Sequence, residues 1–159
     1  MSKQEQLVKL LIEKGFTISF AESCTGGKMA ATIVDVADAS KVLNASCVTY
    51  ANEARMKYVN DSEKTLETFG AVSEQTAKEM AKGVAAANNA DVGVGITGIA
   101  GPGGGTEEKP VGTVCFAYCI QGETKTETVH FGPLGRNNVR DKSVDHVLDM
   151  LIKCVGDVN

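Results

Sequence analysis

The sequence has few of the residues that build metal sites, aromatic cores or nucleic-acid surfaces. It contains no tryptophan, three prolines, two histidines and 5% aromatic residues. Neither an HExxH motif nor a zinc-type grouping of cysteine and histidine occurs, which argues against a structural or catalytic metal. Sixteen basic and twenty acidic side chains leave a net charge of −4, whereas general binding to nucleic-acid phosphates requires a basic surface. We therefore expect neither a metal nor a nucleic-acid partner.

Long apolar segments and paired cysteines are also missing. No apolar run approaches the ~18 residues of a membrane span, and residues 1–15 carry Glu5 and Glu13 within their apolar pattern, unlike a secretory signal peptide. The cysteine count is five, an odd number without a CxxC pair. Cys115 and Cys119 fall on one face of a predicted strand, too far apart to form a disulfide. These features predict a cytoplasmic protein without membrane contact, whose cysteines mostly fill the core.

Helical and strand patterns alternate along the whole chain, and no linker-like stretch divides it. The length of 159 residues corresponds to about one domain. The predicted strand 91–97, apolar from residue 92 to residue 96, is typical of a central strand covered on both faces. The segments 111–121 and 124–131 predict an antiparallel hairpin that turns at Gly122. We predict a three-layer α/β/α fold with a mixed central sheet. The other predicted strands are 16–21 and 43–51. The predicted helices end at Lys14, span 28–36 and 61–69, extend from a cap at Asn52 to about Val59, and follow Ser73 and Gly135.

The first candidate site is a glycine-rich loop, residues 21–27, between a predicted strand and a predicted helix. Backbone N–H groups at the start of a helix have no intrahelical partner and favour negative charge. A serine at this place, Ser23, is suited to act as a nucleophile whose developing oxyanion meets these donors. The alternative is that Ser23 and Thr25 only cap the helix. The loop does not match GxSxG, and the chain contains no SxxK motif.

A second glycine-rich segment, residues 97–105, follows the apolar strand. Residues 93–98 match GxGxxG by letter, but their glycines lie within the predicted strand and no helix follows, so we reject a dinucleotide-binding turn. A P-loop motif is absent as well. The segment is either a flexible connection or a lid or wall beside the first loop, since loops at strand ends hold functional sites.

Cys24 adjoins Ser23 and is an alternative nucleophile. A nucleophilic cysteine requires a nearby histidine that promotes the thiolate. The two histidines, His130 and His146, fall on the last predicted strand and the last predicted helix, and nothing in the sequence brings either of them to Cys24. We therefore favour the serine as the nucleophile.

The chain contains, in this order, four blocks that carry a family resemblance: AESCTGGKMAATI, VTYANEAR, GAVSEQTAKEMA and TGIAGPGGGTEEKPVGTV. Together they resemble the CinA C-terminal domain family, which includes the stand-alone nicotinamide-nucleotide amidohydrolases of the PncC type. The resemblance extends from about residue 5 to residue 153. Larger members carry an additional N-terminal domain that resembles molybdopterin-binding proteins, and we expect that domain to be missing here. The resemblance thus implies one CinA C-terminal-like domain over residues 1–159.

The resemblance also implies a reaction and a set of site residues. The family enzymes hydrolyse the carboxamide of nicotinamide mononucleotide to nicotinate mononucleotide and ammonia, without a metal or another cofactor. By resemblance Ser23 is the nucleophile, Tyr50 supports the site, and Arg55 stands where the motif NEAK has a lysine that helps to activate the serine. The implied substrate-binding residues are Thr25, Gly26, Gly27, Thr97, Gly98 and Arg140, with Arg136 as a second arginine candidate.

Arg55 is the departure from the family motif that affects the chemistry. A guanidinium has a pKa above ~12 and keeps its proton, so Arg55 cannot act as a general base, and general-base assistance is typically worth about 10²–10⁴ in rate. Two hypotheses follow: a serine amidohydrolase with a small nucleotide substrate, or a catalytically weak or silent homologue that binds a pyridine nucleotide or a related small ligand. The apolar stripes of several helices are also compatible with a homodimer.

Overall fold

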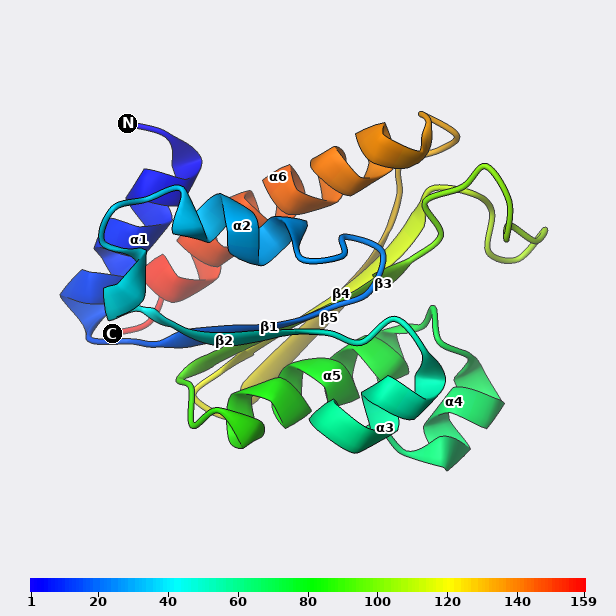
Figure 1. Ribbon diagram of the computed structural model, residues 1–159, viewed down its shortest axis with the longest axis horizontal. Helices are drawn as coiled ribbons and strands as arrows, with labels where there is room; N and C mark the ends of the chain where they lie inside the picture. The colour runs from blue at the N-terminus through cyan, green and yellow to red at the C-terminus, as the bar shows by residue number, and fades with distance from the viewer.

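A mixed five-stranded sheet separates two layers of helices (Figure 1). The computed structural model describes residues 1–159. The strands are β1 (Ile18–Glu22), β2 (Leu43–Val48), β3 (Val92–Gly98), β4 (Thr113–Ile120) and β5 (Glu123–His130). They lie in the order β2-β1-β3-β4-β5, with β1 parallel to both of its neighbours and β4 antiparallel to β3 and β5. This topology confirms the predicted three-layer α/β/α class with a mixed sheet.

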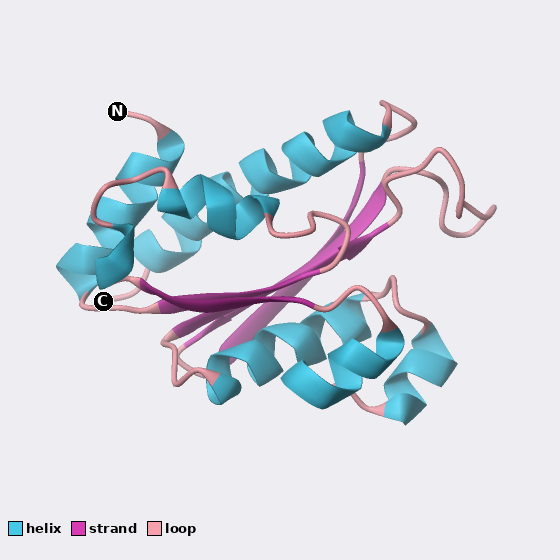
Figure 2. Ribbon diagram, viewed as in Figure 1, coloured by secondary structure: helices cyan, strands magenta, loops and turns pink.

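The two helical layers come from different parts of the chain (Figures 1 and 2). Three helices lie on each side: α1 (Lys3–Lys14), α2 (Lys28–Val34) and α6 (Arg136–Gly156) on one face, and α3 (Asn52–Val59), α4 (Glu63–Phe69) and α5 (Glu74–Ala87) on the other. The chain therefore passes from β1 to β2 over one face of the sheet and from β2 to β3 over the opposite face. None of these helices combines the length and the apolar composition that crossing a bilayer requires.

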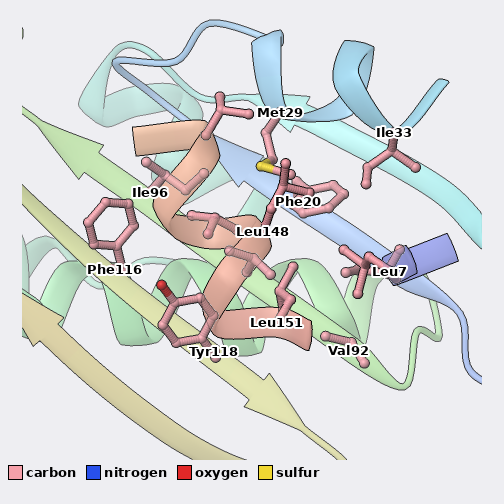
Figure 3. Close-up of a cluster of buried hydrophobic side chains, with 14 of the residues drawn as sticks. Leu7, Phe20, Met29, Ile33, Val92, Ile96, Phe116, Tyr118, Leu148 and Leu151 are labelled. Atoms are coloured by element: carbon pink, nitrogen blue, oxygen red, sulfur yellow. The ribbon is translucent and has the colours of Figure 1, made fainter. Parts of the chain in front are cut away.

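Large apolar side chains fill the layer between the sheet and the helices α1, α2 and α6 (Figure 3). Alternate residues of a strand point to the same face, so Phe20 of β1, Ile96 of β3 and Phe116 of β4 all lie on this side and are fully buried. Met29 of α2 and Leu148 of α6 pack against them from the helical layer. Each fully buried side chain of this size stabilises the fold by about 1.5–3 kcal/mol. The core thus anchors the strands whose ends carry the predicted site.

The opposite face of the sheet is packed more closely, through small residues. Ala77 and Ala81 of α5 lie against Gly93 and Gly95 of β3. A Cβ atom on Gly95 would lie 2.3 Å from the carbonyl oxygen of Ala77, so only glycine permits this approach. The GxGxxG letters therefore reflect close packing of a helix on the sheet, which agrees with the rejection of a dinucleotide-binding turn.

Two helix starts differ from the sequence prediction. Asn52 is the first residue of α3 rather than its cap. The helix predicted from Asp61 begins two residues later, because the Ser62 hydroxyl accepts a 3.0 Å hydrogen bond from the Thr65 amide and caps α4. Asp61 therefore lies between α3 and α4, outside both helices, and its side chain is buried.

Candidate active site

The carboxyl ends of β1, β2 and β3 meet at one edge of the sheet, where ligands commonly bind in open α/β folds. Three connections start there: residues 23–27 after β1, 49–51 after β2 and 99–112 after β3. The N-terminal end of α6 lies over the same edge (Figure 1), where hydrogen bonds from Arg140 tie it to the first of these connections. Most residues predicted for the site belong to these segments.

The Glu22 side chain occupies the N-terminal end of α2. It is fully buried, and its Oε1 accepts hydrogen bonds from the Thr25 hydroxyl at 2.7 Å and from the Met29 amide at 2.9 Å. Its Oε2 accepts from the Ala30 amide and from the Ser46 hydroxyl, both at 3.1 Å. The expectation that the first amides of this helix face a substrate is wrong for Met29 and Ala30, because the chain's own carboxylate already uses them.

Ser23 follows Glu22 and faces the opposite side of the sheet, toward α3. Its amide donates to the carbonyl of Ile96 at 3.0 Å and so continues the pairing of β1 with β3. Its Oγ accepts a 2.7 Å hydrogen bond from Nη2 of Arg55, and only 5% of the residue is exposed. The capping alternative is wrong, since Gly27 is the cap residue of α2 and no side chain bonds to the helix end from that position.

Arg55 is the buried cation of the site. It extends from α3 with 4% exposure and donates through Nη1 to the Tyr50 carbonyl at 3.1 Å and to Oδ1 of Asn52 at 3.0 Å. Its Nε has no hydrogen-bond partner. Burial lowers the pKa of Arg55, and the carboxylate of Asp61 opposes this shift. The arginine at the lysine position of the NEAK motif thus contacts Ser23 directly, as a hydrogen-bond donor.

Tyr50 forms an exposed wall of the site. Its exposed fraction is 59%, and its hydroxyl accepts a 2.9 Å hydrogen bond from Nη2 of Arg136. Nη1 of the same arginine donates to the Gly101 carbonyl at 2.8 Å. Arg136, the second arginine candidate of the sequence prediction, therefore links Tyr50 to the glycine-rich segment that follows β3.

Arg140 holds the loop after β1 from the α6 side. Its Nε donates to the Cys24 carbonyl at 2.9 Å, and its Nη2 donates to the Thr25 carbonyl at 3.0 Å. Gly26 leaves room for this contact, because a Cβ atom there would lie 3.3 Å from Nη2 and the residue has a φ of +57°. The loop is therefore bound by Glu22 on its inner side and by Arg140 on its outer side.

Thr97 and Gly98 end β3 beside this loop. Thr97 is fully buried, and its hydroxyl donates a 2.8 Å hydrogen bond to the Ala71 carbonyl, so its proton is used within the fold. A Cβ atom on Gly98 would lie 2.8 Å from Cγ2 of Val114, which makes glycine a packing requirement between β3 and β4. Neither residue shares a side-chain hydrogen bond with Ser23.

The geometry also bears on the cysteine alternative. Cys24 is 5% exposed, and burial raises the pKa of its thiol to about 12. His130 lies at the end of β5, and His146 pairs with Glu127 of that strand. No histidine bonds to Cys24 to promote a thiolate, which supports the preference for Ser23.

All three arginines of the chain, Arg55, Arg136 and Arg140, gather at this edge of the sheet. None of them forms an ion pair, since the ion pairs in the structure involve lysines and His146. The three guanidinium groups concentrate positive charge here, although the net charge of the protein is −4. No group of three or more histidine, cysteine, aspartate or glutamate side chains is arranged to hold a metal ion. The arrangement is suited to an anionic ligand.

Two buried carboxyl residues of the site, Glu22 and Asp61, were not predicted from the sequence. A signal for Glu22 exists, because Ile18, Phe20 and Glu22 share one face of a strand. That spacing places a carboxylate on a buried face, where it requires hydrogen-bond donors. Asp61 gave no comparable signal, since an acidic residue is also common in the first turn of a helix.

A profile of the CinA C-terminal domain family matches residues 1–155 of the chain. The chain belongs to this family. A protein of Clostridium perfringens named as competence-damage inducible is 50% identical over 148 residues, which are 93% of this chain and 36% of that protein. A CinA-like protein of Kosmotoga olearia is 47% identical over 150 residues, 94% of this chain and 36% of the relative. This CinA-domain chain thus spans 36% of the length of these curated relatives.

Solved structures of CinA proteins share the fold. The competence/damage inducible protein CihA from Agrobacterium tumefaciens superposes with a TM-score of 0.91 at 39% identity, covering 99% of this chain and 98% of that one. The competence damage-inducible protein A from Klebsiella pneumoniae superposes with a TM-score of 0.95 at 32% identity, covering 99% and 97% of the two chains. The CinA fold inferred from the sequence blocks is therefore confirmed over nearly the whole chain.

Proposed function

We propose that this CinA-domain chain is a serine amidohydrolase that converts nicotinamide mononucleotide to nicotinate mononucleotide and ammonia. The observation that carries the proposal is the 2.7 Å hydrogen bond from Arg55 to Oγ of Ser23, at the carboxyl end of β1. A buried guanidinium beside a hydroxyl favours the anionic form of that hydroxyl, which is the form that attacks a carbonyl carbon. Ser23 is therefore the group on which a nucleophilic role rests.

The remaining arginines support a substrate that carries a phosphate. Arg136 and Arg140 project from the first turns of α6 toward the same edge of the sheet, and guanidinium groups bind phosphate oxygens through charge-assisted hydrogen bonds. The exposed ring of Tyr50 lies next to them and offers an aromatic face to a cationic pyridinium ring. A pyridine mononucleotide presents both of these groups.

The reaction also needs donors for the tetrahedral oxyanion. In the first step Oγ of Ser23 bonds to the carboxamide carbon and the carbonyl oxygen becomes negative, while the proton of the hydroxyl passes to the amide nitrogen. The C–N bond then breaks, the carbonyl re-forms as an ester, and ammonia leaves. Water subsequently hydrolyses the ester and releases nicotinate mononucleotide. The amide of Gly27 donates to no carbonyl of the chain and Gly27 is only partly buried, so we assign this amide to the oxyanion. A donor of this kind typically contributes about 10²–10³ in rate. The positive pyridinium ring withdraws electrons and eases the attack.

Ammonia release by the purified protein tests the proposal. We expect ammonia from nicotinamide mononucleotide, and a value of kcat/KM about 10²-fold lower for nicotinamide riboside, which lacks the phosphate that the arginines bind. No ammonia above the protein-free blank would refute the proposed activity. Equal values for the two substrates would refute the phosphate-binding role of Arg136 and Arg140.

A catalytically silent pyridine-nucleotide-binding protein is the second candidate, and Arg55 is the observation that favours it. The side chain at this position donates to Ser23 and cannot accept its proton. Such a protein would bind nicotinamide mononucleotide at the same arginines and release no ammonia.

Substitution of Arg55 by lysine separates the two candidates. A buried lysine can lose its proton and accept that of Ser23, so we expect Arg55→Lys to raise kcat for ammonia release about 10-fold or more. Lys57→Arg is the matched control, because Lys57 is exposed, with its Nζ 5.2 Å from the centre of the Tyr58 ring, and its kcat should be unchanged. A fall in kcat for Arg55→Lys would instead mean that the reaction requires the guanidinium itself.

A further inference from the structure

Asp61 is a buried carboxyl group without hydrogen-bond partners. Only 4% of the residue is exposed, and neither Oδ1 nor Oδ2 accepts a hydrogen bond. Glu22 is buried as deeply but accepts four hydrogen bonds. A buried carboxylate without such partners is costly unless an opposite charge balances it. The position of Asp61 therefore calls for a cation close by.

Arg55 supplies that charge, although its guanidinium forms no direct salt bridge with Asp61. The turn that ends α3 brings the two residues together, because the amides of Asn60 and Asp61 both donate to the Arg55 carbonyl. Asn60 makes this reversal with a φ of 59°. Nε of Arg55 and both carboxylate oxygens of Asp61 are buried polar atoms without partners. Burial is the main influence on the pKa of each side chain, and beyond it Asp61 raises the pKa of Arg55 while Arg55 lowers that of Asp61.

We propose that Asp61 is a positioning residue of the Ser23 site: its carboxylate is the buried counter-charge that keeps the Arg55 guanidinium on the Ser23 hydroxyl. Asp61 acts through Arg55 and touches no substrate. This inference rests on the proposed function only in that Ser23 is the reacting group. Without a negative charge at position 61, Arg55 is an isolated cation in the protein interior, and hydration of its guanidinium competes with the contact to Ser23.

The charge on Asp61 changes within an accessible pH range. Burial and the Glu79 carboxylate raise the pKa of Asp61 to about 7, against the opposing effect of Arg55. Glu79 of α5 and Arg55 of α3 are the charged groups that face Asp61. Above this pH Asp61 is ionised and balances Arg55, whereas below it Asp61 is neutral. The contact between Arg55 and Ser23 therefore weakens on acidification.

Nuclear magnetic resonance of the intact chain tests the charge pairing without reference to any substrate. With only three arginines, ¹⁵N-arginine labelling yields three Nε–H signals, which Arg→Lys variants assign. We expect the Arg55 signal to move with a midpoint near pH 7, where Asp61 titrates, and to stay in place in Asp61→Asn. Arg136 and Arg140 are internal controls whose signals should not follow this midpoint. An Arg55 signal that does not move, or that moves equally in Asp61→Asn, overturns the pairing.

Enzyme kinetics test whether the charge pairing of Asp61 with Arg55 contributes to the reactivity of Ser23. We expect Asp61→Asn to lower kcat for ammonia release about 10-fold at a pH near 8, to leave KM unchanged, and to abolish the acidic limb of the pH profile. A purely structural role would lower the rate at every pH and leave that limb in place, and it would overturn the inference. In an Arg55→Met background the same change should have no further effect, because Asp61 acts through Arg55.

A serine-reactive probe tests the role of Asp61 independently of whether nicotinamide mononucleotide is the substrate. Phenylmethanesulfonyl fluoride sulfonylates reactive serines, so its rate of reaction with Ser23 reports on the hydroxyl alone. A protein that reacts with the probe but releases no ammonia refutes the proposed substrate, and the pH profile of labelling then decides the role of Asp61. Absence of both reactions refutes Ser23 as the reacting group and this inference with it.

Glu79→Gln provides a milder perturbation in case Asp61→Asn does not fold. Glu79 is partly exposed on α5, and its charge raises the pKa of Asp61. Removing that charge should shift the midpoint of the Arg55 signal and of the acidic limb to lower pH, with the maximal rate unchanged. Midpoints that do not move overturn the assignment of the titration to Asp61.

Discussion

Ser23→Ala is expected to abolish ammonia release from nicotinamide mononucleotide and to leave binding of the nucleotide intact. Without Oγ no bond forms to the carboxamide carbon, and loss of a serine nucleophile typically lowers kcat about 10³-fold or more. Only Arg55 contacts this hydroxyl, and the two arginines proposed to bind the phosphate, Arg136 and Arg140, do not. Calorimetry should therefore find the dissociation constant of the nucleotide within about threefold of the parent value.

Ser19→Ala is the matched control for this experiment. Ser19 lies four residues before Ser23 on β1, on the same face of the sheet, and it is fully buried with a hydroxyl that has no hydrogen-bond partner. Its replacement should leave kcat unchanged and should not lower the thermal midpoint, because no hydrogen bond is lost. Retention of full activity in Ser23→Ala would exclude the serine mechanism.

Gly83→Ala is expected to cause the largest loss of stability from a single methyl group. A Cβ atom on Gly83 of α5 would lie 1.6 Å from the carbonyl oxygen of Val59, at the end of α3. In an open helix this change stabilises by about 1 kcal/mol, but here the two helix backbones must separate, and overpacking of this kind typically costs about 3 kcal/mol. Calorimetry should find the thermal midpoint lowered by about 6–12 °C.

Gly156→Ala is the matched control, because Gly156 is a helical glycine with room for a Cβ atom. It is the last residue of α6, and a Cβ atom there would meet only Cδ2 of Leu10, at 3.9 Å. We expect its thermal midpoint to equal that of the parent or to exceed it slightly. A similar loss in both variants would mean that the contact between α3 and α5 is not the cause.

The fold could be predicted from the sequence because its strongest patterns are local. The predicted strand 91–97, whose residues 92–96 are all apolar, became the central strand β3. The turn at Gly122 joins β4 and β5 with positive φ angles at both Gln121 and Gly122. The order of the strands has no such local signal. Tertiary packing sets the position of β2 outside β1, whereas α4 begins after Ser62 because the hydroxyl of that residue caps the helix.

The sequence predicted which residues form the candidate site but not the contacts between them. The sequence blocks named Ser23, Tyr50 and Arg55, and the structure joins these residues through the guanidinium of Arg55. The partner of the Tyr50 hydroxyl is Arg136, which lies 86 residues further along the chain. No local pattern encodes a contact at that separation. The sequence therefore does not predict which groups each arginine side chain bonds to.

The hydrogen bonds that fix the loop after β1 on two sides have a consequence for how a ligand enters. Glu22 and Arg140 bind the loop through side chains of the protein itself, so this part of the site is fixed by the fold and ligand association there costs little conformational entropy. Residues 102–108, which are all exposed, are the part of the rim left to adjust. Discrimination between ligands of different length therefore depends on that glycine-rich rim, while the geometry around the Ser23 hydroxyl stays the same for all of them.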